Sequence, residues 1–554
     1  MGQKTRTADI GQERVKAALH DIIEQDIVTR IWQEDHSVWK PEPQEISNRL
    51  GWLSAGADIV DNLSQINSLT RQIRDAGYIH TVLLGMGGSS LAPDVFSRTF
   101  GGGECKPDIH PRPDLRVLDS TSPGAVLALA ESLDLSRTLF IVSTKSGGTV
   151  ETLSMFKYYY NRVAEAGREA HAGEHFAAIT DPDSQLADIA HRYDFRATFI
   201  NDPNIGGRFS VLSFFGLAPA ATICIDLDRL LERAAGMADR CGAEVPPHEN
   251  PAAWLGVTIA EYANAGRDKL TFVISPPVAS FGDWVEQLIA ESLGKEGRSV
   301  VPIVDEPLGP PEVYGADRVF VHIRLGDDDT HDAALMSLEA AGQPIIRLAM
   351  DDVYDLGEQF FLWEMATAIA GYRMGVNPFD QPNVEAAKVL ARQMVAEYQE
   401  RGTLPPAPSS PPSVEGLAEF LAQGKPGDYI AIHAYVQPTP EMDQALLALR
   451  TRLRDSYRLA TTVGYGPRFL HSTGQLHKGG TNSGLFIQLV GDEPRDAPIP
   501  DEAGAQDSSI SFGVLKDAQA LGDWRALVDA RRRVVRIGLG LDVAQAIRRL
   551  TGIG

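Results

Sequence analysis

Two glycine- and hydroxyl-containing segments have the residue types that bind a phosphate group. Residues 83–91 (LLGMGGSSL) place Gly88 and Ser89 between an apolar run and a helix start, and residues 140–153 (FIVSTKSGGTVETL) repeat that arrangement. Glycines let backbone amides approach a ligand, and a helix N-terminus favours an anion. Each segment alone fits a plain turn or helix cap equally well. Together, at the ends of two strands of one sheet, they predict a shared anion site.

The second segment adds hydroxyl groups and a cation. Thr144, Lys145, Ser146 and Thr149 can all face one ligand, and such donors suit a phosphate monoester. The lysine has no GxxxxGK[ST] context, so the pattern disfavours a nucleotide-binding loop.

Two further segments could act on a developing negative charge or a proton. Residues 204–217 place Arg208 after Gly207, and a guanidinium there can stabilise an oxyanion. Gln287 and Glu291, four residues apart, share one face of an expected helix. Taken alone, a surface salt bridge and an exposed polar helix face explain these residues better.

Lysine and histidine residues near the C-terminal half could transfer protons. Lys388 follows two X-Pro pairs in residues 375–388, and His471 and His477 lie among the glycines of residues 464–480. Histidine is the natural proton shuttle near neutral pH. Two histidines six residues apart without an acidic partner make a poor metal site, so no metal is expected.

Composition limits the function classes. The 554 residues include 51 Lys and Arg against 74 Asp and Glu, and the net charge of −23 argues against nucleic-acid and anionic-membrane binding. The apolar runs all fall short of the roughly 20 residues of a membrane span. Three cysteines are too few for a disulfide framework and favour a reducing cytoplasm.

Short apolar runs alternate with helical segments, which predicts an α/β protein with parallel sheets. The breaker-rich residues 244–251 and 402–413 suggest boundaries. We therefore expect a helical segment over 1–50, a first α/β domain over 51–245, and the first part of a second over 252–400. Residues 414–554 are expected to pack with that second domain, and 491–509 to form an exposed loop.

Together, the segments resemble the phosphoglucose isomerase family. The sequence has GMGGSS (85–90), TKSGGTVET (144–152), GGRFS (206–210), QLIAESLGK (287–295), FDQPNVEAAK (379–388) and LHSTGQ (470–475), which match the family's motifs from about residue 80 to 480. The resemblance implies two SIS-type domains, each a mainly parallel sheet flanked by helices, with the C-terminal extension completing the second. It also implies an active site between the domains, in a cytoplasmic homodimer.

The resemblance assigns roles by position. It implies a cofactor-free isomerase of glycolysis and gluconeogenesis that interconverts glucose 6-phosphate and fructose 6-phosphate through an enediolate. Glu291 would be the base, with Gln287 beside it, Arg208 would stabilise the enediolate, and Lys388 and His471 would assist ring opening. The remaining expected substrate contacts are Gly88, Ser89, Thr144, Lys145, Ser146, Thr149 and Gly207.

The order of the motifs departs from the common family arrangement, because Lys388 precedes His471 here. This order resembles the longer bacterial type and the isomerase half of transaldolase–isomerase fusions, so a transaldolase partner is a further expectation. His477 and, more weakly, His331 are rivals of His471. Alternative functions are an isomerase that also accepts mannose 6-phosphate and a non-catalytic SIS sugar-phosphate sensor. An amidotransferase-type SIS unit is disfavoured, because no cysteine lies near the N-terminus.

Overall fold

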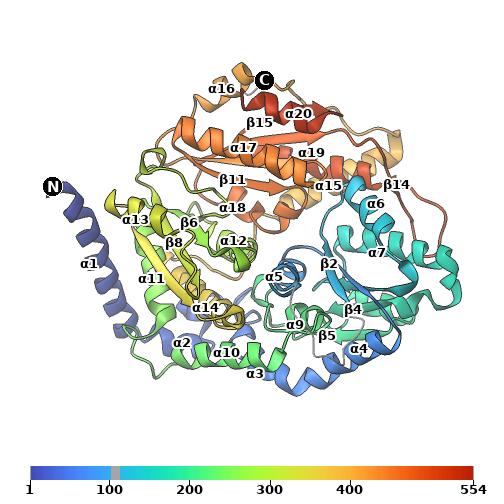
Figure 1. Ribbon diagram of the computed structural model, residues 1–554, viewed down its shortest axis with the longest axis horizontal. Helices are drawn as coiled ribbons and strands as arrows, with labels where there is room; N and C mark the ends of the chain where they lie inside the picture. Colours follow the sequence, from blue (N-terminus) through green and yellow to red (C-terminus); the bar gives the residue numbers. More distant parts are fainter. Residues whose placement is uncertain (1, 102–112, 553–554) are drawn as a thin grey trace.

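Three parallel β-sheets, each flanked by helices, form the body of the protein (Figure 1). The computed structural model describes residues 2–101 and 113–552. The expected α/β class is confirmed. The helices are α1 (Gly2–Glu24), α2 (Ile27–Trp32), α3 (Trp52–Asp58), α4 (Leu63–Asp75), α5 (Leu91–Phe100), α6 (Pro123–Ser132), α7 (Val150–Val163), α8 (Gln185–Arg192), α9 (Phe214–Ala221), α10 (Leu227–Arg240), α11 (Pro251–Asn264), α12 (Phe281–Leu293), α13 (Asp332–Ala340), α14 (Leu356–Met374), α15 (Glu385–Arg401), α16 (Val414–Leu421), α17 (Pro440–Tyr457), α18 (Gly474–Gly479), α19 (Phe512–Asp529) and α20 (Val543–Leu550).

The first sheet carries both expected anion-binding loops. Its order is β2 (Asp114–Leu118), β1 (His80–Gly85), β3 (Thr138–Ser143), β4 (Phe176–Thr180) and β5 (Ala197–Ile200), all parallel. Every residue of β3 and β4 is buried, as a strand covered by helices on both faces requires. Because β1 and β3 are parallel neighbours, the loops that follow them leave the same edge of the sheet.

The second and third sheets are separate four-stranded sheets. One has the order β7 (Val301–Ile303), β6 (Lys269–Ile274), β8 (Arg318–Leu325), β9 (Ile345–Met350); the other has β11 (Ala460–Tyr465), β10 (Tyr429–Tyr435), β12 (Gly484–Gly491), β15 (Arg533–Gly540). The C-terminal residues were expected to complete the second domain. They share with it an apolar cluster that includes Ala290, Ile303 and Tyr429, and they form a four-stranded sheet of their own. Apolar runs indicate strands without indicating which strands pair.

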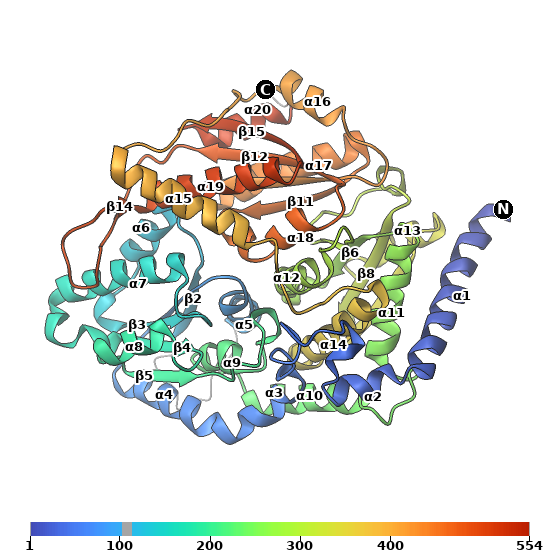
Figure 2. The same cartoon turned by 180° about the vertical axis from the view of Figure 1, so that it is seen from behind.

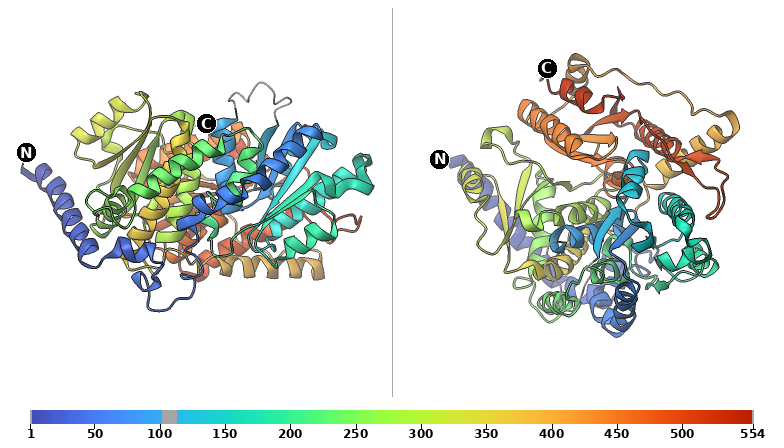
Figure 3. Two further views of the ribbon diagram at one scale, coloured as in Figure 1. Left: turned by 90° about the horizontal axis from the view of Figure 1, so that it is seen from below. Right: turned by 45° about the vertical axis from the view of Figure 1, so that its right-hand side comes forward.

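The N-terminal end of helix α1 extends away from the rest of the chain, as the left view of Figure 3 shows. Its second half packs on α11, and Leu19 and Ile22 are buried there. On the opposite side of the molecule, α15 runs along α19, which places residues more than a hundred positions apart side by side (Figure 2).

Residues 491–509, expected as an exposed loop, are mostly exposed, and they form an arm that reaches the first α/β unit. Strand β13 (Pro498–Ile499) pairs with β14 (Ile510–Ser511), and Ile499 joins the apolar cluster around β3 and α7. Asn161 of α7 donates from Nδ2 to the carbonyl oxygen of Ala505 at 2.6 Å. The polar composition of these residues gave no sign of this contact, because much of the contact is made by backbone groups.

The cysteines give no support for a particular compartment. Cys241 is a buried free thiol, and Cys224 is disulfide-bonded. Cys105 lies outside the described residues. One disulfide is not a framework, yet it removes cysteine content as an argument for a reducing cytoplasm. Within residues 2–101 and 113–552, the helices are all too short or too polar to cross a lipid bilayer.

Candidate active site

Two glycine loops touch directly and bring the first expected segment beside the arginine. Gly88 lies in a short 3₁₀ turn after β1, and a Cβ atom built there would stand 2.1 Å from the carbonyl oxygen of Gly207. Only glycine fits such a backbone contact. Ser89 is buried in the same turn. The close approach fixes the position of Arg208, the residue after Gly207.

The hydroxyl-rich loop joins β3 to α7. Thr144 and Thr149 share a hydrogen bond of 2.8 Å between their hydroxyl oxygens, and Thr149 is the residue that precedes α7. Gly147 has φ of +73°, and a Cβ there would meet the backbone nitrogen of Leu186 at 2.7 Å. Lys145 was expected to supply the cation of this loop, but its ammonium group forms an ion pair with Asp181.

A cavity of about 400 Å³ opens beside this loop. It lies between the first unit, helix α15 and the third unit, and it is the size of a small-molecule site. Of the expected residues, it is lined by Ser146, Thr149, Lys388 and His471; Glu151, Lys478 and Gln519 also line it. Lys388 projects from the first turn of α15 and is exposed to solvent at the cavity.

His471 is held in this cavity by an acid. Its Nε2 lies 2.8 Å from Oε1 of Glu151, and Gln519 donates from Nε2 to the same oxygen at 2.7 Å. Burial acts to raise the pKa of Glu151, but the adjacent His471 outweighs it, and the pKa of Glu151 ends below its ordinary value. An ionised Glu151 accepts a hydrogen bond from a protonated Nε2 of the ring. Nδ1 of His471 is then the nitrogen that can exchange a proton with a ligand.

Glu291 and Arg208 form a buried ion pair next to this histidine. Arg208 Nη1 lies 3.1 Å from Glu291 Oε2, and the two side chains are 3% and 10% exposed. Burial raises the pKa of Glu291 above its ordinary value, against the opposing charges of Arg208 and His471. Gln287, one helical turn earlier on α12, donates from Nε2 to the carbonyl oxygen of His471 at 2.7 Å. A carboxylate of raised pKa beside a guanidinium is suited to take a proton from carbon next to a carbonyl.

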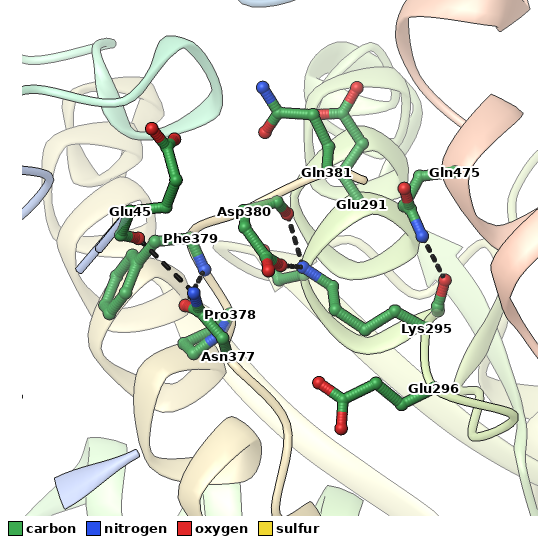
Figure 4. A network of polar contacts seen from close by, with 12 residues as sticks. Glu45, Glu291, Lys295, Glu296, Asn377, Pro378, Phe379, Asp380, Gln381 and Gln475 are labelled. Atoms are coloured by element: carbon green, nitrogen blue, oxygen red, sulfur yellow. Dashed lines mark hydrogen bonds and ion pairs between the residues drawn. The ribbon is translucent and has the colours of Figure 1, made fainter. Parts of the chain in front are cut away.

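Arg208 is fixed by more than Glu291. Nε donates to Ser292 Oγ at 2.8 Å, and Nη1 donates to Gln381 Oε1 at 2.8 Å. Nη2 donates to the backbone carbonyl oxygens of Pro378 at 2.5 Å and Asp380 at 3.0 Å. Figure 4 shows Glu291 and Gln381 close together, with the segment that follows Asn377 running past them.

The two rival histidines lie elsewhere. His477 is buried in the third unit, stacked at 4.6 Å on His433, and burial holds its pKa well below the ordinary value. Its ring nitrogens have no hydrogen-bond partner among the described residues. His331 precedes α13, with Nε2 3.2 Å from the carbonyl oxygen of Ile274. The geometry thus favours His471 over both.

Sequence reasoning missed three side chains. Glu151 is part of the quoted motif and lies in the first turn of α7, where acidic residues are common, so its type gave a weak signal. Gln381 directly precedes Pro382 in another quoted motif. Gln519 lies on α19 outside every motif, and its contact with Glu151 spans 368 positions, so nothing in the local pattern indicated it. Within the part of the chain that the structure describes, no group of three or more His, Cys, Asp or Glu side chains could hold a metal ion.

Comparison with known proteins supports the resemblance. The family model "Phosphoglucose isomerase" matches residues 57–310. The glucose-6-phosphate isomerase of Rubrobacter xylanophilus is 30% identical over 375 residues, which are 59% of this chain and 85% of that protein. This chain belongs to the phosphoglucose isomerase family. A probable glucose-6-phosphate isomerase of Methanococcus maripaludis is 26% identical over 388 residues, 63% of this chain and 85% of that one.

Solved structures agree on the fold. A crystal structure of a glucose-6-phosphate isomerase from Chlamydia trachomatis has a TM-score of 0.58 at 17% identity, over 70% of this chain and 86% of that one. A hypothetical protein from Thermus thermophilus reaches a TM-score of 0.57 at 25% identity, over 70% of this chain and 98% of that one. Both support the α/β architecture of a phosphoglucose isomerase.

Proposed function

We propose that this protein interconverts glucose 6-phosphate and fructose 6-phosphate by proton transfer through an enediolate. The observation that carries the proposal is the buried Glu291–Arg208 pair next to His471, and His471 itself lines the cavity beside the hydroxyl-rich loop. A non-catalytic sensor built on the same loops would need neither the base nor the guanidinium. Family membership adds independent support.

Each group has a chemical task in this proposal. The hydroxyls of Ser146 and Thr149 and the nearby backbone amides bind the phosphate, since the Lys145 ammonium is paired with Asp181. His471, oriented by Glu151, and Lys388 move protons on the ring and chain oxygens as the ring opens. Glu291 then takes the proton from C2 of glucose 6-phosphate and returns it to C1, while Arg208 offsets the charge on the enediolate.

One chain supplies all four proposed catalytic groups. Arg208 comes from the first unit, Glu291 from the second, His471 from the third, and Lys388 from α15 between the last two. In this proposal a second copy is not needed to complete the site. The homodimer, the transaldolase partner and the cytoplasmic location remain predictions.

The proposed reaction is tested by running it in deuterated water. We expect fructose 6-phosphate to be converted to glucose 6-phosphate with deuterium entering C2, because a proton held by Glu291 can exchange with solvent. A coupled dehydrogenase assay measures turnover, and NMR locates the deuterium. Mannose 6-phosphate, supplied in parallel, tests the broader substrate range. Binding of sugar phosphate without turnover would favour the sensor and refute the enzyme.

The pH dependence of kcat/KM should follow the titration of Glu291, the proposed base. Glu291 acts only when ionised, so kcat/KM is expected to fall as the pH drops through its pKa, which burial raises above the ordinary 4.5. The substrate phosphate also titrates near pH 6, roughly. A Glu291→Asp variant separates these two titrations. The fall in kcat/KM that is due to the base should move to lower pH, while the fall that is due to the substrate phosphate should stay at the same pH. A profile unchanged in shape would assign the acid limb to another group.

A further inference from the structure

The segment 377–383, between α14 and α15, is held by side chains from all three α/β units. Arg208 of the first unit donates to two of its carbonyl oxygens. Lys295 of the second unit contacts Asp380, and Gln475 of the third accepts from the backbone nitrogen of Asn383 at 2.8 Å. The segment leads directly into α15, which carries Lys388. Its position therefore affects both the guanidinium and the exposed lysine of the site.

Two buried cations meet at one backbone oxygen of this segment. The carbonyl oxygen of Asp380 accepts from Arg208 Nη2 at 3.0 Å and from Lys295 Nζ. Lys295 is fully buried, and its Nζ also lies 2.7 Å from Asp380 Oδ1 (Figure 4). Burial and the nearby Arg208 lower the pKa of Lys295 to about 7, against the attraction of Asp380, so Lys295 carries its full charge only below that pH.

The charges of this cluster balance in pairs. Arg208 faces Glu291, and Lys295 faces Asp380. If Lys295 were absent, the carboxylate of Asp380 would have no cation of its own, and the guanidinium next to its carbonyl would be the nearest one. At short range, such a competing carboxylate attracts the buried guanidinium, although its own side chain is 28% exposed.

We propose that Lys295 is a positioning residue, which neutralises Asp380 and thereby keeps the Arg208 guanidinium directed at the reacting atoms. This inference rests on the proposed function. Lys295 touches no substrate in this view; it acts through Asp380 on Arg208, and through the same segment on the start of α15.

The test is a pair of variants with a predicted rescue. Lys295→Met should lower kcat about 30-fold, because misplacing a catalytic group by about 1 Å costs up to a hundredfold. KM for fructose 6-phosphate should stay within about threefold, since the phosphate-binding loop is untouched. Adding Asp380→Asn to Lys295→Met removes the competing charge, so the double variant should recover most of the lost rate.

A binding measurement separates positioning from general damage. A five-carbon sugar-acid phosphate carries a carboxylate where the enediolate charge would be, and its affinity should fall in parallel with kcat in Lys295→Met. Glu296→Gln is the matched control: it is the next residue, and it breaks only the exposed ion pair with Lys40. Thermal unfolding confirms that the compared proteins are folded.

The outcomes are distinct. If Lys295→Met is unstable, Asp380→Asn alone still tests the inference, since it should retain at least half of the rate while Lys295 loses its partner carboxylate. A folded Lys295→Met with wild-type kcat, or a double variant slower than either single variant, would overturn the role of Lys295 and leave the proposed function standing. An inactive wild type would contradict both.

Discussion

Glu291→Gln is expected to lower kcat for the isomerisation about a thousandfold, within the range that a positioned general base contributes. Gln has nearly the same size and can still accept from Arg208, but it cannot take a proton from carbon. KM should change little, because the groups proposed to bind the phosphate lie in a different loop. The measurement is the coupled assay from fructose 6-phosphate, with the protein concentration determined by a method that does not depend on activity.

Two controls make this result interpretable. Glu339→Gln breaks an exposed ion pair with Arg347 and should leave kcat unchanged. Circular dichroism and thermal unfolding must show that Glu291→Gln is folded, because it removes one member of a buried pair. Should it not fold, Glu291→Asp keeps the charge but retracts the carboxylate, and a loss of about ten- to a hundredfold is expected. A folded Glu291→Gln with more than a tenth of wild-type kcat would assign the base elsewhere.

Arg208→Lys is the second large effect, with kcat expected to fall about a hundredfold. Arg208 makes five hydrogen bonds with three nitrogens, and an ammonium group cannot reproduce that fork. The variant keeps the positive charge, so the loss measures geometry more than charge. Binding of the sugar-acid phosphate should weaken by a similar factor, while KM for fructose 6-phosphate changes less.

The control for this variant is Arg548→Lys, whose exposed ion pair with Glu441 joins α20 to α17. It should retain full activity. If Arg208→Lys keeps wild-type kcat, charge alone suffices at this position, and the fixed direction of the guanidinium is irrelevant to the chemistry.

Local patterns were enough to predict most strands of the three sheets and the loops that carry the site. Strand β4, Phe176–Thr180, is an apolar run that ends in a threonine, and such a run has few alternatives to a buried strand. Ala460–Tyr465 was missed as a strand, since its threonines and glycine weaken the apolar signal. The ion pairs of the site could not be predicted from the sequence, because a contact such as that of Arg208 with Glu291 depends on how separate units pack together.

The same holds for the membership of the third sheet and for the contacts of residues 491–509. Sheet membership follows from hydrogen bonding between strands, which apolar periodicity does not encode. The arm over 491–509 has the composition of a loop, and its contacts with Asn161 of α7 and with the apolar cluster around β3 join parts of the chain that are far apart in sequence.

The contacts of Glu151 also bear on how the protein is made. His471 and Gln519 follow Glu151 by 320 and 368 positions. At about 5 to 20 residues per second, the ribosome takes roughly 20 to 70 s to add the chain between Glu151 and Gln519. During that time the first sheet can fold, with Glu151 facing water in the half-built cavity. The cavity is therefore one of the last parts of the nascent protein to be completed.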